Sequence, residues 1–122
     1  MDLHARRSHL QTADNPEPRL DYIVTLEGSI GSNLLRLRYV PDRQILLPAS
    51  LSDYLAGFDA AGLQLEGIAA MILHDLNNEL VARWVQVSVS QSDLSGPAHT
   101  VSIEDRQPKW DNPGLLARLT SH

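Results

Sequence analysis

The chain has no cysteine among its 122 residues, and this absence excludes more chemistry than any other feature of its composition. Without thiols there is no disulfide framework, no thiolate-bound metal or iron–sulfur cluster, and no cysteine nucleophile. Basic residues are also few, since ten Lys and Arg stand against fifteen Asp and Glu. Because binding to a phosphate backbone needs clustered cations, we expect no nucleic-acid partner.

Long apolar runs are missing as well. The longest, residues 68–76, is interrupted by His74 and Asp75 and falls far short of a membrane span. No secretory segment follows Met1, because arginine and histidine residues interrupt the first ten positions. We therefore expect a cytoplasmic protein with no membrane partner. Its length suffices for one domain with its own hydrophobic core.

Composition divides the chain into three parts. Residues 1–19 combine charges and prolines without an apolar period, which predicts an N-terminal arm that is ordered only if something docks it. Residues 20–105 carry the periodic apolar patterns of the domain itself. Residues 106–122 form a C-terminal extension with a short amphipathic segment, able to dock on the body or on a neighbouring subunit.

Four segments of the domain alternate between apolar and polar residues, which is the pattern of half-buried strands. They are residues 20–27, 34–40, 83–90 and 99–105. Residues 28–33, with two glycines, are predicted to be a short linker that makes the first two strands a hairpin.

Two helices are predicted between the second and third strands. The first covers residues 51–58, with Ser50 or Ser52 as its cap and Gly62 at its end. The second begins near residue 65 or 66 and keeps its apolar residues on one face as far as Leu80.

The predicted order of elements is ββααββ. Four antiparallel strands with a pair of inserted helices make an α+β domain whose helices cover one face of the sheet. The other face is only moderately polar, so we expect it to pack against another subunit. Its residues are Ile23, Thr25, Leu34, Ser88, Thr100 and Ser102.

Few residues suggest chemistry of their own. The five histidines have no partner at a recognised ligand spacing, so we predict no metal site. Neither a serine-nucleophile motif nor a glycine-rich phosphate loop occurs. Glu66 stands at the start of the second helix, where a carboxylate either complements the helix dipole or contacts a ligand. The residues alone leave both alternatives open.

Three segments carry a family resemblance. They are residues 15–22, with Asn-Pro-Glu-Pro before Asp-Tyr; residues 36–43, Arg-Leu-Arg-Tyr-Val-Pro-Asp-Arg; and residues 47–66, with Ser50, Tyr54, Phe58, Gly62 and Glu66. In this order they resemble the 7-cyano-7-deazaguanine reductases of queuosine biosynthesis, over residues 15 to 90.

The resemblance implies the tunnelling fold, in which ββααββ subunits join their sheets into a barrel and bind purine- or pterin-like rings at subunit junctions. Glu66 stands at the place of the family glutamate that reads the amidine-like edge of the ring. We therefore predict Glu66 and Ser50 as ligand contacts in a homo-oligomer. The small heterocyclic ligand is a deazaguanine, a purine or a pterin.

The departures from the family pattern are equally specific. Its Cys-Pro-x-Thr-Gly-Gln-Pro-Asp-Phe segment supplies a thiolate that attacks the nitrile, and here residues 28–33 read Gly-Ser-Ile-Gly-Ser-Asn. The family histidine before the glutamate is Leu65 here. Two family lysines are replaced by Ala49 and Ser52, and residues 92–96 replace an arginine-glycine-glycine stretch. We therefore predict no nitrile reduction, no NADPH binding and no other cofactor.

Three hypotheses of function stay open, and the first is favoured. The chain is a binding module, a relative without reductase activity that holds a ring through Glu66. Alternatively it is an enzyme of altered chemistry on a similar heterocycle, with His74, His99 or a residue of a neighbouring subunit as acid or base. The third hypothesis is a structural subunit that co-assembles with another protein. Whether the chain is an enzyme is thus undecided by its sequence.

Overall fold

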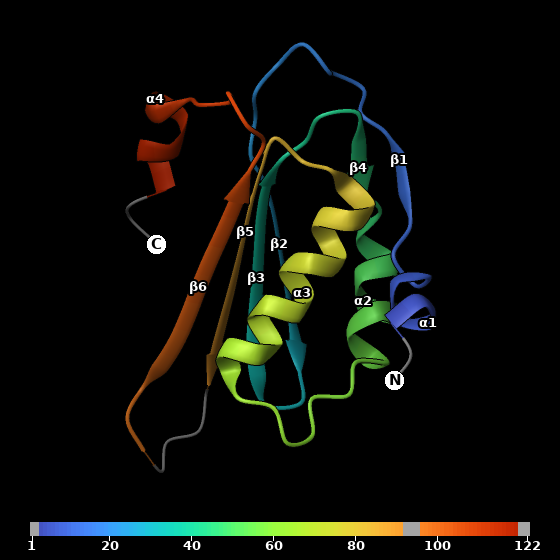
Figure 1. The fold of residues 1–122 in the computed structure, drawn as a ribbon, viewed down its shortest axis with the longest axis vertical. Helices are drawn as coiled ribbons and strands as arrows, with labels where there is room; N and C mark the ends of the chain where they lie inside the picture. The colour runs from blue at the N-terminus through green and yellow to red at the C-terminus, as the bar shows by residue number, and fades with distance from the viewer. Residues whose placement is uncertain (1–2, 92–95, 120–122) are drawn as a thin grey trace.

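A four-stranded antiparallel sheet forms the centre of the molecule (Figure 1), with the strand order β2-β3-β5-β6. Its strands are β2 (Val24–Ile30), β3 (Asn33–Val40), β5 (Trp84–Gln91) and β6 (His99–Arg106). The predicted α+β class is confirmed, and the central elements follow the predicted order.

The computed structural model describes residues 3–91 and 96–119. Four of the five residues that replace the family's arginine-glycine-glycine stretch, residues 92–95, lie outside the described part, and so does His122.

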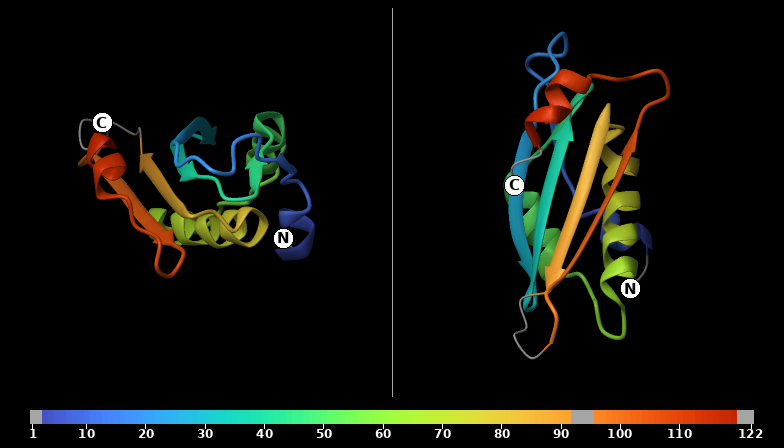
Figure 2. Two further views of the ribbon diagram at one scale, coloured as in Figure 1. Left: turned by 90° about the horizontal axis from the view of Figure 1, so that it is seen from above. Right: turned by 90° about the vertical axis from the view of Figure 1, so that its left-hand side faces the viewer.

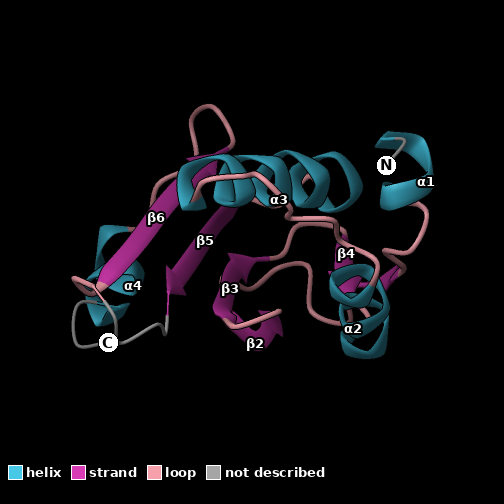
Figure 3. Ribbon diagram, turned by 90° about the horizontal axis from the view of Figure 1, so that it is seen from below, coloured by secondary structure: helices cyan, strands magenta, loops and turns pink. Residues whose placement is uncertain are grey.

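Two helices cover one face of this sheet (Figure 3). They are α2 (Pro48–Ala56), which packs against β2, and α3 (Leu65–Leu80), which packs against β5 and β6. Alternation along the strands turns one set of side chains towards the helices, and the innermost of these include Leu37, Tyr39 and Val87. The predicted start of α3 is confirmed. Among the helices of residues 3–91 and 96–119, none is long and apolar enough to cross a membrane.

The predicted linker is shorter than expected. β2 continues to Ile30, and only Gly31 and Ser32 separate it from β3. Gly31 has a φ of 58°, a value that glycine adopts without strain. Gly28 lies within β2, where a Cβ would come within 2.7 Å of the Leu55 Cδ1 atom. This glycine therefore lets α2 approach the sheet closely.

The bounds predicted for α2 are wrong at both ends. The helix begins at Pro48, so neither Ser50 nor Ser52 is its cap, because proline at the first position presets a helical φ and lacks an N–H that would need a partner. It ends at Ala56, several residues before Gly62.

Short elements precede and interrupt the predicted domain. They are α1 (Leu3–Arg7), β1 (Thr12–Asp14) and β4 (Gln44–Leu46), and β1 pairs with β4 in a second, two-stranded antiparallel sheet. α1 lies beside α2 (Figure 1), and its Arg6 and Arg7 contact Asp75 of α3. Residues of the predicted arm are thus held against the body.

The C-terminal segment contains α4 (Pro113–Leu116) and the 3-10 turn η1 (Ala117–Leu119). It lies on the opposite side of β6 from α3 (Figure 2). The Trp110 Nε1 and Asn112 Nδ2 atoms both donate to the Asp21 carboxylate. These contacts connect the segment to the start of β2.

Candidate functional site

One end of the sheet carries a row of polar side chains beneath the start of α3. Asn33 pairs with Gln91 across β3 and β5, and Gln91 pairs with His99 across β5 and β6. By strand alternation these three residues share the face that the helices cover. The next row on the same face is Leu35, Val89 and Val101. The polar row is therefore the point where the core ends.

Glu66 lies above this row, in the first turn of α3. Its Oε2 atom is 3.7 Å from Nε2 of His99. The Glu66 side chain is 62% exposed and that of His99 is 46% exposed, so both remain accessible from solvent. The structure thus brings together a carboxylate and an imidazole that lie 33 positions apart in the sequence.

The space around this pair is a pocket of about 450 Å³, within the roughly 300–1,000 Å³ typical of small-molecule sites. Besides Glu66 and His99, it is lined by Asn33, Leu63, Gln64, Leu65 and Gln91. The lining offers one carboxylate acceptor, one imidazole and three side-chain amides. We call it the Glu66 pocket. It can form hydrogen bonds with a flat polar ring.

Ser50, the other predicted ligand contact, lies elsewhere. It is buried in α2, where its hydroxyl donates to the Leu47 carbonyl at 2.7 Å and accepts from the Gln11 N–H at 3.1 Å. The same hydroxyl is thus part of the contact between α2 and the segment before β1. Within one subunit the structure does not bring Ser50 into the Glu66 pocket, and its predicted ligand contact stays a prediction.

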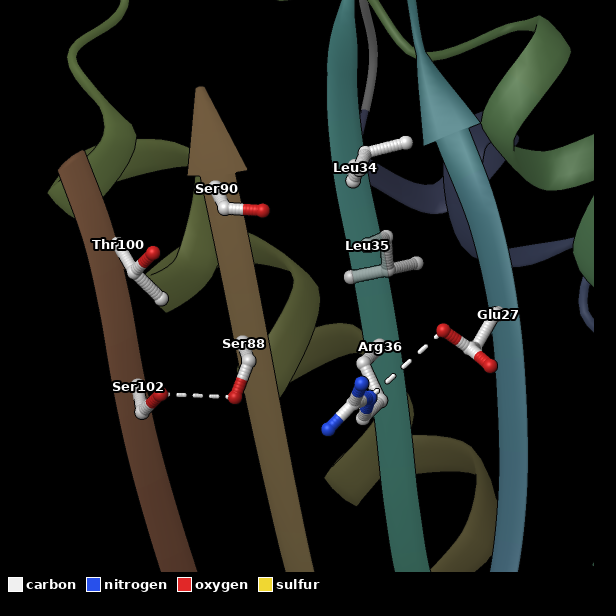
Figure 4. A pocket seen from close by; sticks show the side chains of 8 residues that line it. All are labelled: Glu27, Leu34, Leu35, Arg36, Ser88, Ser90, Thr100 and Ser102. Atoms are coloured by element: carbon white, nitrogen blue, oxygen red, sulfur yellow. Dashed lines mark hydrogen bonds and ion pairs between the residues drawn. The ribbon is translucent and has the colours of Figure 1, made fainter. Parts of the chain in front are cut away.

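A second hollow lies on the open face of the sheet, the face turned away from α2 and α3 (Figure 4). Four hydroxyl side chains from β5 and β6 border it, together with Leu34, Arg36 and Glu27. Two of its polar groups are already engaged with each other, since the Ser88 and Ser102 hydroxyls are 2.7 Å apart and share a hydrogen bond. These groups are thus less available to a ligand than those of the Glu66 pocket.

Arg38 lies on the open face one pleat beyond Arg36 and is only 5% exposed. Its Nε and Nη2 atoms form no hydrogen bond with any residue that the structure describes. Burial, and then the repulsion of Arg36, lowers the pKa of this guanidinium. A buried charged donor without a partner costs free energy, so this face carries unused hydrogen-bonding capacity.

Metal ligands do not gather anywhere in residues 3–91 and 96–119: no group of three or more His, Asp or Glu side chains there could hold an ion. Of the predicted chemical residues, His74 is exposed on α3 and does not line the Glu66 pocket. The sequence indicated His99, like His74, only as a candidate acid or base, because its place beside Glu66 depends on strand pairing.

Comparison with curated proteins gives a consistent result. The chain is 32% identical over 115 residues to the NADPH-dependent 7-cyano-7-deazaguanine reductase of Syntrophus aciditrophicus, covering 85% of this chain and 82% of that protein. It is 29% identical over 118 residues to the protein of the same name from Nitrosococcus oceani, covering 88% and 92%. The protein of that name from Anaeromyxobacter dehalogenans is 32% identical over 103 residues. No protein-family model matches the sequence.

Proposed function

The chain belongs to the family of the NADPH-dependent 7-cyano-7-deazaguanine reductases, and from this premise we propose that it is a member that binds a ring without reducing a nitrile. The ligand is a deazaguanine-, purine- or pterin-like heterocycle held at a junction between subunits. The observation that carries the proposal is the Glu66 pocket, an accessible carboxylate among amides in a chain that has no cysteine.

The Glu66 carboxylate is the group that recognises the ring. A guanine-like or pterin-like edge presents a ring N–H next to an exocyclic amino group, and a carboxylate accepts both in parallel. Charge-assisted hydrogen bonds of this kind are stronger than neutral ones and fix the orientation of the ring. The side-chain amides of Asn33, Gln64 and Gln91 then offer further contacts along the ring.

Nitrile reduction requires a nucleophile that this chain lacks. The thiolate of the family attacks the nitrile carbon, and no cysteine is present. At the place of the family's cysteine segment the chain completes β2 and turns through Gly31 into β3. A serine in this segment does not replace the thiolate, since a serine hydroxyl is a weak nucleophile without an adjacent base.

Association of subunits as in the tunnelling fold completes the proposal. Among the described strands, β2 and β6 form the two edges of the four-stranded sheet, and their outer sides pair with no other strand. Such edges favour pairing with another chain. The open face supports the same proposal through Leu34, a large apolar side chain that is 55% exposed.

Native mass spectrometry tests the assembly and the ligand together. We expect a species several times the 13.5 kDa subunit mass that retains 7-deazaguanine or a pterin when either is added. A monomer at micromolar concentrations would contradict the shared site. An oligomer that binds no ring at millimolar concentration would instead favour the structural-subunit hypothesis.

A further inference from the structure

We propose that His99 reads the oxygen of the bound ring and so determines which heterocycle the Glu66 pocket accepts. This inference rests on the proposed function and deepens it, because it assigns a second recognition group to the same pocket. The ligand class it selects is a ring whose N–H and amino donors lie next to a carbonyl oxygen.

The distance between the two side chains is the first argument. The His99 Nε2 and Glu66 Oε2 atoms are 3.7 Å apart, which is close enough for electrostatic attraction but too far for a hydrogen bond. Neither atom is therefore occupied by the other. The two can contact neighbouring atoms of one ligand edge, with the carboxylate accepting and an Nε2–H donating.

The chemistry of the edge is the second argument. A guanine-like edge carries, in order, an amino group, a ring N–H and a carbonyl oxygen. A carboxylate satisfies the two donors, and the remaining acceptor needs a donor on one side of that carboxylate. The histidine lies beside Glu66 at this distance, and a site that hydrogen-bonds a ligand group discriminates strongly against an analogue without it.

The backbone holds His99 in position. It is the first residue of β6 and pairs with Gln91 of β5, so the strand register fixes where its side chain leaves the sheet. Glu66 is fixed independently by the first turn of α3. The pair therefore comes from two elements of regular structure, which hold side chains more precisely than loops do.

The test compares two ring probes on three proteins by calorimetric titration. The probes are 7-deazaguanine and its 6-thio analogue, in which a sulfur, a weaker acceptor, replaces the carbonyl oxygen. The proteins are the parent, His99→Leu and His99→Gln. We expect the parent to bind 7-deazaguanine about tenfold more tightly than the thio analogue, as loss of one good hydrogen bond predicts.

The variants separate recognition from stability. His99→Leu is expected to bind the two probes within about twofold of each other, and His99→Gln, which keeps an N–H donor, is expected to restore the preference for oxygen. If His99→Leu keeps the full preference for oxygen, the role of His99 is overturned while the proposed function is not. If the parent binds neither probe at millimolar concentration, the proposed function itself is overturned, and this inference with it.

Discussion

Arg6 and Asp75 form a buried ion pair across 69 positions of the sequence. The Arg6 Nε atom lies 2.5 Å from one carboxylate oxygen of Asp75, and its Nη2 atom lies 2.9 Å from the other. Arg7 donates a further bond at 2.8 Å, and the Tyr54 hydroxyl also donates to this carboxylate. Asp75 therefore connects α1 and α2 to α3, the helix that carries Glu66.

We predict that Asp75→Asn destabilises the fold by about 3–5 kcal/mol, because breaking a buried pair leaves the charge of Arg6 uncompensated. The measurement is urea unfolding of the parent and the variant at neutral pH. Asp53→Asn is the matched control, since Asp53 is exposed on α2, and we expect a change within about 0.5 kcal/mol. Equal losses in the two variants would contradict the role of the ion pair.

The same carboxylate predicts a pH dependence of stability. Burial alone would raise the pKa of Asp75, but hydrogen bonds from Arg6, Tyr54 and Arg7 outweigh burial and hold this pKa below its ordinary value of 3.8. The stabilisation is thus fully present above the ordinary value and is lost as the pH falls through the lower, folded value.

Unfolding of the parent and of Asp75→Asn between pH 7 and pH 2 measures this dependence. We expect the stability difference between the two proteins to be constant down to about pH 4 and to shrink below it. A difference that is unchanged at pH 2 would show that ionisation of Asp75 contributes nothing.

Val81 ends α3 in a left-handed conformation, with φ 46° and ψ 50°, which is unfavourable for a β-branched residue. Its side chain is 59% exposed, so it contributes little packing. We predict that Val81→Gly stabilises the protein by about 0.5–1 kcal/mol. Glycine relieves the backbone strain of the folded state, and part of this gain is offset because glycine raises the conformational entropy of the unfolded chain. Thermal unfolding measures the effect. Val81→Ala, which keeps a Cβ, should gain less, and a Val81→Gly variant less stable than the parent would refute the argument.

The sequence predicted the elements with long, regular periods and missed those that depend on contacts. Alternation over residues 83–90 and 99–105 located β5 and β6, and the apolar face of residues 65–80 located α3. β1 and β4 have three residues each, too few to show a period. Their pairing, between segments about 30 positions apart, is visible only in three dimensions.

The position of Asp75 in the sequence indicates that its side chain is buried, although its charge suggests that it is exposed. It lies three residues after Ile72 and seven after Ile68, on the buried face of α3, yet its charge made it look like an interruption of the apolar run. Its partners Arg6 and Arg7 precede the predicted domain and Tyr54 lies on α2, so no local pattern indicated them. The pairing of His99 with Glu66 was hidden for the same reason, because it follows from the register of β6 on β5.

Reduction of 7-cyano-7-deazaguanine by NADPH is predicted to be absent, because the chain has no thiolate to attack the nitrile. The measurement is the loss of NADPH absorbance in the presence of the nitrile. We expect a rate equal to that of the protein-free blank, with the relative from Syntrophus aciditrophicus assayed in parallel as the positive control. Turnover approaching about 1 s⁻¹, the low end of ordinary enzyme rates, would mean that another group replaces the sulfur.

Ring binding by Glu66 is the central claim, and calorimetric titration of Glu66→Ala tests it most directly. The probes are guanine, 7-deazaguanine and pterin, and Glu79→Ala, which removes a carboxylate near the other end of α3, is the control for charge. We predict that Glu66→Ala weakens binding of the preferred ring about tenfold or more, since hydrogen bonds to a charged group contribute about 1.5–3 kcal/mol each, while Glu79→Ala binds as the parent does. If affinity is unchanged in Glu66→Ala and only stability falls, by about 0.3–1 kcal/mol, Glu66 is a helix-dipole residue and the account is contradicted.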